Sequence, residues 1–82
     1  MPTIILETLL PIFQLIDEMV TKEKTLSLSN AHDVKQCLHV MIGKPLNEQT
    51  VVDARNCLRS LKNEKTEFAI NRIIKILIRV TG

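Results

Sequence analysis

Residues 68–80, FAINRIIKILIRV, decide the fold that this sequence predicts. On a helix that turns about 100° per residue, the polar residues of this stretch fall within roughly 100° of arc, and the remaining circumference is apolar. These polar residues are Asn71, Arg72, Lys75 and Arg79. A helix with so wide an apolar surface must bury it, either at the centre of a small protein or against another chain.

The same stretch has a second interpretation as a β-strand, because its second half is rich in β-branched residues. In a strand, alternate residues from Ile74 to Val80 would form one apolar face. We prefer the helix, because the basic residues share one helical stripe and because Asn63 or Thr66 can cap it. The sequence therefore predicts a helix that begins between Glu64 and Thr66 and runs almost to the end of the chain.

Apolar residues recur at helical spacing over residues 4–20, which predicts a first helix with Thr3 as its cap. Pro11 lies inside this helix, on its polar side. Proline removes a backbone donor and clashes with the preceding turn. We expect a kink at Pro11, with two shorter helices as the alternative.

Residues 21–29, TKEKTLSLS, lose the helical period and predict a loop. We expect Leu26 and Leu28 to fold back from this loop onto the core. A second helix is predicted over residues 31–42, because Asn30 suits an N-cap and Asp33 follows it by three residues.

The most strongly specified local structure is the connection at residues 43–51, GKPLNEQTV. Gly43 suits the left-handed residue that follows a helix, and Pro45 prevents the helix from continuing. Asn47 suits the N-cap of a third helix over residues 48–62, with Leu46 and Val51 as its hydrophobic staple. The second and third helices are therefore predicted to form a hairpin.

Together these elements predict an all-α fold, a compact four-helix bundle that forms a single domain over residues 1–82. We expect the helical hairpin to pack against a central C-terminal helix. The chain has 82 residues, 45% of them hydrophobic, which is more apolar surface than one small core hides. The surplus predicts a surface for self-association or for a partner, and a tightly packed monomer is the alternative.

Charge and composition argue against several functional classes. The net charge is only +2 and aromatic residues make up 2%, whereas nucleic-acid binding favours a strongly basic face and aromatic stacking platforms. The only glycines are Gly43 and Gly82, so no glycine-rich phosphate loop is present. No metalloprotease or serine-hydrolase motif occurs either, and we expect neither enzymatic activity nor a cofactor.

Two histidines and two cysteines are the soft metal ligands of the chain: His32, Cys37, His39 and Cys57. They lack the closely spaced pairs of a zinc site, so we expect no metal. A disulfide between Cys37 and Cys57 would cross the helical hairpin. Counted from the turn, however, Cys57 lies further along its helix than Cys37, and this offset predicts that the disulfide does not form.

The sequence also predicts where the chain resides. The apolar N-terminus has no basic region before it and meets Glu7 and Pro11 early, unlike a secretory signal. No window is apolar and long enough to predict a transmembrane span. We expect a soluble protein in a reducing compartment, namely the cytoplasm, with the nucleus as an alternative.

We predict a non-enzymatic protein-interaction module, a small regulator or adaptor that forms a homodimer or binds another protein. Apolar faces of the first and last helices would form the contact. The candidate apolar residues are Leu10, Phe13, Leu15, Ile74, Leu77 and Ile78. The acidic face of the first helix and the basic stripe of the last, Arg72, Lys75 and Arg79, would together contact the complementary charges of a second copy or of another chain. The alternative is that water solvates each of the two faces independently.

Two alternatives remain open. A helix-turn-helix DNA-binding regulator would use the helix over residues 48–62 as its reader, since it carries Arg55, Asn56 and Arg59. Glu48 and Asp53 lie on the same helix and oppose a phosphate backbone. The second alternative is a HEAT-like helical repeat or docking fragment, built from two helical hairpins.

Overall fold

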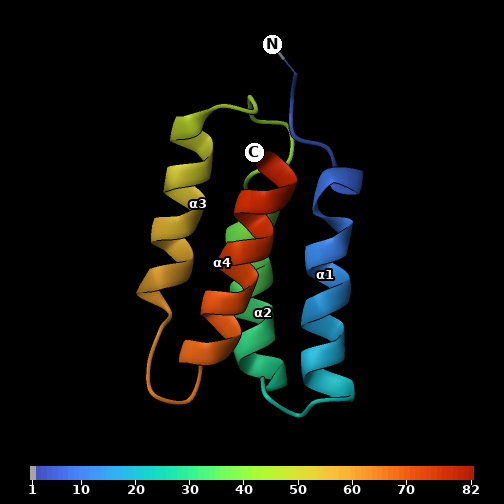
Figure 1. The fold of residues 1–82 in the computed structure, drawn as a ribbon, viewed down its shortest axis with the longest axis vertical. Helices are drawn as coiled ribbons and strands as arrows, with labels where there is room; N and C mark the ends of the chain where they lie inside the picture. Colours follow the sequence, from blue (N-terminus) through green and yellow to red (C-terminus); the bar gives the residue numbers. More distant parts are fainter. Residues whose placement is uncertain (1) are drawn as a thin grey trace.

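A computed structural model describes residues 2–82, which form α-helices joined by short connections (Figure 1). The helices are α1 (Leu6–Thr21), α2 (Leu28–His39), α3 (Glu48–Ser60) and α4 (Glu67–Thr81). They run alternately up and down the long axis, with α1 and α3 each packed between α2 and α4. The all-α four-helix prediction is therefore confirmed, and the strand interpretation of residues 74–80 is wrong.

Helix α4 occupies one corner of the bundle, so the prediction that it lies at the centre is wrong. One side of α4 packs into a core to which every helix contributes, through residues such as Ile12 of α1, Leu38 of α2 and Leu58 of α3. The helical wheel of residues 68–80 predicted a wider buried surface than α4 has in the structure. Phe68 and Ile78 are exposed, and only one side of the helix is in the core.

The N-terminal segment is extended and pairs with the connection between α2 and α3. The Ile4 amide donates to the Lys44 carbonyl oxygen at 2.8 Å, and the Gly43 amide donates to the Ile4 carbonyl oxygen at 2.7 Å. The Ile4 side chain is fully buried. Helix α1 consequently begins at Leu6 rather than at residue 4, and Thr3 does not cap it.

Helix α1 continues through Pro11 for its full 16 residues. Pro11 is exposed, on the side of the helix away from the core, where water can hydrogen-bond to the freed carbonyl. The alternative of two shorter helices is therefore wrong.

Helix α2 begins earlier than predicted, because Ser27 caps it instead of Asn30. The Ser27 Oγ accepts a hydrogen bond from the Asn30 amide at 3.1 Å. Leu26, just before the cap, folds into the core as predicted, whereas Leu28 begins the helix with its side chain 78% exposed. The buried Leu26 fixes where the chain enters α2, and this selects Ser27 over Asn30.

Helix α2 ends at His39, three residues before the predicted end. The chain continues in turns up to Gly43, whose φ of 87° confirms the predicted left-handed conformation. Asn47 caps α3 as predicted, since its Oδ1 accepts from the Thr50 amide at 2.9 Å. Helix α3 ends at Ser60 instead of residue 62.

Thr66 occupies the N-cap position of α4, but its side chain bonds the preceding turn and none of the helix amides. Its buried Oγ1 accepts from the Asn63 amide at 2.9 Å and donates to the Leu61 carbonyl oxygen at 3.1 Å. The Asn63 Oδ1 in turn accepts from the amides of Lys65 and Thr66, in the turn before the helix. Neither predicted residue therefore caps α4 through its side chain, and the helix begins at Glu67.

Cys37 of α2 and Cys57 of α3 form a disulfide, with their Cα atoms 5.8 Å apart, so the prediction against it is wrong. The predicted difference in level between Cys37 and Cys57 assumed a short turn between α2 and α3. In the structure, the turns and the extended segment after α2 carry the chain past the end of α2 before α3 begins (Figure 1). This extra length brings the two cysteines level.

Within residues 2–82, no helix combines the length and the hydropathy needed to cross a bilayer.

We expect reduction of the disulfide to lower the free energy of unfolding by about 3 kcal/mol, because the bond closes a loop of 20 residues in the unfolded chain. Urea unfolding with and without a thiol reductant measures this difference. A Cys37→Ser/Cys57→Ser variant is the control and should not respond to the reductant. Equal stability of the oxidised and reduced wild-type chain would contradict the prediction.

Candidate functional site

The predicted apolar contact residues of α4 divide between core and surface. Leu77 is fully buried and Ile74 is 7% exposed, so both belong to the core. Ile78 is 45% exposed and faces the side of α4 next to α3. Of the three, only Ile78 offers its side chain to a partner.

The predicted contact residues of α1 lie on a different part of the surface. Leu10 is exposed, and Phe13 is half-buried with its ring centroid 5.0 Å from that of His39 on α2. Leu15 is half-buried against the core. Because Phe13 contacts α2 and Ile78 borders α3, the α1 and α4 candidates do not form one continuous surface.

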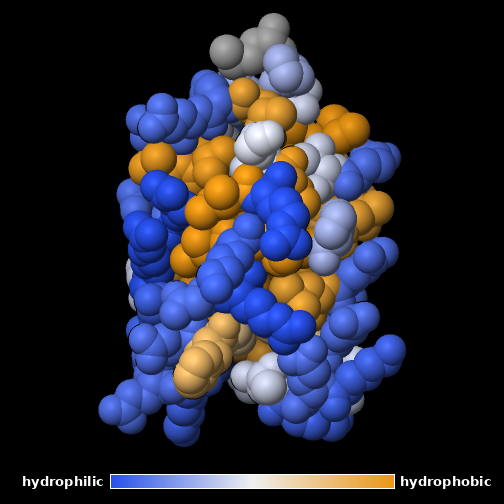
Figure 2. All heavy atoms as spheres, viewed as in Figure 1, coloured by the Kyte–Doolittle hydropathy of each residue, from blue (hydrophilic) through white to orange (hydrophobic). Residues whose placement is uncertain are grey.

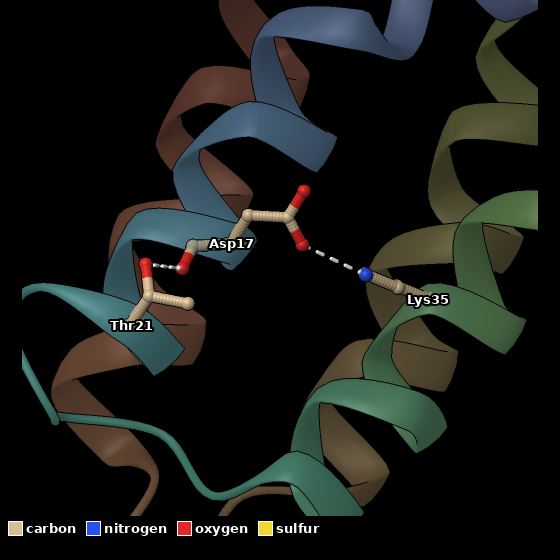
Figure 3. Close-up of polar contacts among 3 residues, drawn as sticks. All are labelled: Asp17, Thr21 and Lys35. Carbon is tan, nitrogen blue, oxygen red and sulfur yellow. Dashed lines mark hydrogen bonds and ion pairs between the residues drawn. The ribbon is translucent and has the colours of Figure 1, made fainter.

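Charged residues of the predicted contact are partly used within the chain. Asp17 reaches from α1 to Lys35 on α2, where Oδ1 and Nζ are 2.9 Å apart, and Thr21 donates to the Asp17 backbone oxygen (Figure 3). Arg72 of α4 pairs with Glu23 at 2.8 Å. These pairs stabilise the packing of neighbouring elements and weaken the expectation that both faces serve a partner.

Lys75 and Arg79 remain on the exposed side of α4, and within residues 2–82 neither takes part in an ion pair. They are four residues apart, so they lie one turn from each other on the same face. Lys75 also precedes Ile78 by three residues. On the helix both cations lie on the same side of Ile78, about 60° and 100° around from it, and Ile78 itself faces α3.

Ile78 forms one wall of a groove between α3 and α4, a hollow of about 350 Å³ that opens to the surface. The opposite wall comes from the first turns of α3, which Asn47 caps. We call this hollow the α3–α4 groove. Its lining residues are Leu46, Asn47, Glu48, Val51, Val52, Arg55, Ile78, Thr81 and Gly82.

Arg55 is the basic residue that lines the α3–α4 groove, and Glu48 is the acidic one. The Arg55 side chain is half-buried, and its Nε atom is buried without a hydrogen-bond partner. A buried donor that has lost water and gained no acceptor destabilises the free protein. Because protein atoms enclose the Nε, an acceptor that entered the groove would meet the outer nitrogens of the guanidinium, which forms no ion pair within residues 2–82.

Further basic residues border the groove one turn away. Arg59 follows Arg55 by four residues on α3, and Lys75 precedes Ile78 on the antiparallel α4, so both lie at the same level of the bundle. Figure 2 shows hydrophobic residues gathered over the upper half of this face between α3 and α4, bordered by strongly hydrophilic residues that cross α4. The site is an apolar groove with a basic margin.

The charges of the chain divide unequally between its two parts. Residues 54–82 contain seven basic and two acidic residues, a net charge of +5. Residues 1–53 contain four basic and seven acidic residues, a net charge of −3, and the two sum to the overall +2. The small total therefore conceals a basic surface on the part of the chain that forms most of α3 and all of α4.

Sequence reasoning missed Phe68, which is 88% exposed at the start of α4 and lines another surface hollow with Arg72 and Lys75. The helical wheel did indicate that Phe68 is exposed, because this residue falls at the middle of the polar arc of the helix. Val52 and Arg55 were also missed as parts of an apolar groove. No local signal reveals them, since their side chains meet Ile78 only when α3 and α4 pack together.

Comparison with known proteins finds no matching family model, and no curated protein or solved structure that matches the chain.

We expect Leu77→Ala to lower the free energy of unfolding by about 2–5 kcal/mol, because it opens a cavity in the core. Ile78→Ala, one residue further on the same helix, should cost less than about 1 kcal/mol because its side chain is already half exposed. Urea unfolding measures the free energy of unfolding of both variants, and Ile78→Ala serves as the matched control. Equal losses would show that Ile78 belongs to the core.

Proposed function

We propose that this chain is a non-enzymatic protein-binding module, a small regulator or adaptor that contacts its partner through the α3–α4 groove. The observation that carries this proposal is the groove itself. It combines an exposed Ile78, an apolar wall at Val51 and Val52, and the guanidinium of Arg55, which forms no ion pair within residues 2–82. Groups that are incompletely satisfied in the free chain are those that a partner would complete.

The form of the groove favours a protein segment over a small molecule. Two antiparallel helices with apolar side chains on their facing edges form a hollow here that is open to the surface. Amphipathic helices bind in such channels through residues that recur at helical spacing. Small-molecule sites, in contrast, enclose most of their ligand.

The charge distribution favours a different chain over a second copy. In a two-fold symmetric dimer through this face, each surface would meet its own equivalent. Arg59, Lys75 and Arg79 would then approach the same residues of the second copy, and this repulsion opposes association. We therefore favour a heterologous partner over the homodimer that the composition suggested.

DNA reading by α3 has less support. Helix-turn-helix readers cross their partner helix at a large angle and project the second helix into the major groove. Here α2 and α3 run antiparallel along the bundle and are joined by the disulfide (Figure 1). The apolar wall of the α3–α4 groove would also lie against phosphates. A HEAT-like docking fragment would use the same groove, so the experiments below apply to it as well.

A photoreactive benzophenone side chain placed at Val52, inside the groove, tests the proposal in an extract of the source cells. The control carries the same group at Gln36, an exposed residue of α2. We expect protein adducts at position 52 that are absent at position 36 and that an added Ile78→Asp substitution abolishes. Identical adducts from both positions, or adducts unaffected by Ile78→Asp, would refute the groove as the site.

The solution mass of the chain separates the two kinds of protein partner. Light scattering on a sizing column should give the monomer mass of 9.3 kDa at low salt and at high salt, because the basic face repels its own copy. A stable dimer that Ile78→Asp dissociates would keep the protein-binding role but replace the heterologous partner with a second copy.

A further inference from the structure

We propose that the α3–α4 groove binds an acidic amphipathic helix of another protein, and that Arg55 pairs with a carboxylate of that helix. This inference rests on the proposed protein-binding function and names the chemistry of its partner. Three features of the groove support it in turn: the apolar walls, the unpartnered Arg55 and the basic margin.

The apolar walls define the face of the ligand that enters the groove. Val51 and Val52 of α3 oppose Ile78 of α4, and Leu46 lies at the end where α3 begins. Leu46, Val51 and Val52 are half-buried and Ile78 is half exposed, so all four retain apolar surface to contribute. A helix with leucine-type residues at positions i, i+3 or i+4, and i+7 would cover this surface from one side.

Arg55 selects the charge of the ligand. Arginine donates hydrogen bonds but accepts none, so a ligand that pairs with it must supply acceptors. A carboxylate can accept from the outer guanidinium nitrogens of Arg55 in the bidentate geometry that favours arginine over lysine. Because Arg55 is half-buried and forms no ion pair within residues 2–82, this pairing gains more than one at a fully exposed arginine would.

The basic margin extends the selection beyond one carboxylate. Arg59 and Lys75 lie on opposite sides of the groove at the same level, and Arg79 lies one turn from Lys75. Acidic residues on both flanks of the bound helix would therefore face positive charge. Glu48 stands at the opposite end, near the start of α3, so the most acidic part of the ligand should lie toward Arg59 and Lys75.

The same surface suits nucleic acid less well. Phosphates would have to rest against apolar side chains, and no aromatic residue lines the groove within the described chain to stack on a base. Glu48 would repel the backbone at one end. An acidic protein segment satisfies both the apolar walls and the cations, whereas a phosphate backbone satisfies the cations alone.

The test uses a fluorescein-labelled synthetic peptide of 18 residues, with leucines at helical spacing on one face and glutamates on both flanks. Fluorescence anisotropy measures its binding to the full chain. One control peptide replaces every glutamate by lysine, and a second replaces every leucine by serine. A labelled DNA duplex is titrated in parallel. We expect binding of the acidic amphipathic peptide, and at least tenfold weaker binding of both control peptides and of the duplex.

Variants of the chain then locate the binding. Arg55→Gln and Ile78→Asp should each lower the affinity for the acidic peptide about tenfold or more. The first removes a charge-assisted hydrogen bond and the second an apolar contact. Lys22→Gln removes one positive charge far from the groove and should change binding less than about twofold. Arg55→Lys keeps the charge without the bidentate geometry and should bind more weakly than the wild type. Circular dichroism confirms that each variant is folded.

Several outcomes would overturn the inference. These are binding of the lysine peptide as tight as that of the glutamate peptide, wild-type affinity in both Arg55 variants, or tight duplex binding that depends on Arg55. If the benzophenone at position 52 still captures a protein in the extract while the acidic peptide does not bind, the partner chemistry is wrong and the protein-binding function remains. If neither experiment gives a positive result, both proposals fail.

Discussion

The backbone pairing between Ile4 and the connection after α2 is the constraint on which the upper half of the bundle depends. It satisfies amide and carbonyl groups of two irregular segments and buries the Ile4 side chain. It also pairs Pro45 with Thr3, so that the chain runs beyond the end of α2 before α3 starts. The level of α3 relative to its neighbours follows from this, and with it the positions of Cys57 beside α2 and of Arg55 beside α4.

Features determined by nearby residues could be predicted from the sequence. Asn47 caps α3 and Gly43 is left-handed because each depends on a few neighbouring residues. Where two cap residues compete, the choice depends on tertiary contacts. Ser27 and Asn30 are equally good caps, and only the burial of Leu26 decides between them. The prediction of where α1 starts was wrong for the same reason, because that start depends on pairing with a segment about 40 residues away.

The candidate site shows the same division between local and non-local information. The helical wheel correctly separates the basic stripe of α4 from its buried face, and it would have placed Phe68 at the surface had its angle been considered. It cannot separate Leu77 from Ile78, because that depends on which sides of α4 are covered by α1 and α3. The role of Arg55 is least accessible, since its buried Nε results from the packing of two helices.

The disulfide and the α3–α4 groove use opposite edges of α3. Cys57 and Arg55 are two residues apart, about 200° around the helix, so one faces α2 and the other faces α4. A chain of 82 residues has a small core and limited stability, and leaving a groove unfilled lowers that stability further. The disulfide offsets this loss at the edge of α3 that faces away from the groove. Helix α3 is thereby fixed to α2, and the groove can remain open in the free chain without loss of the fold.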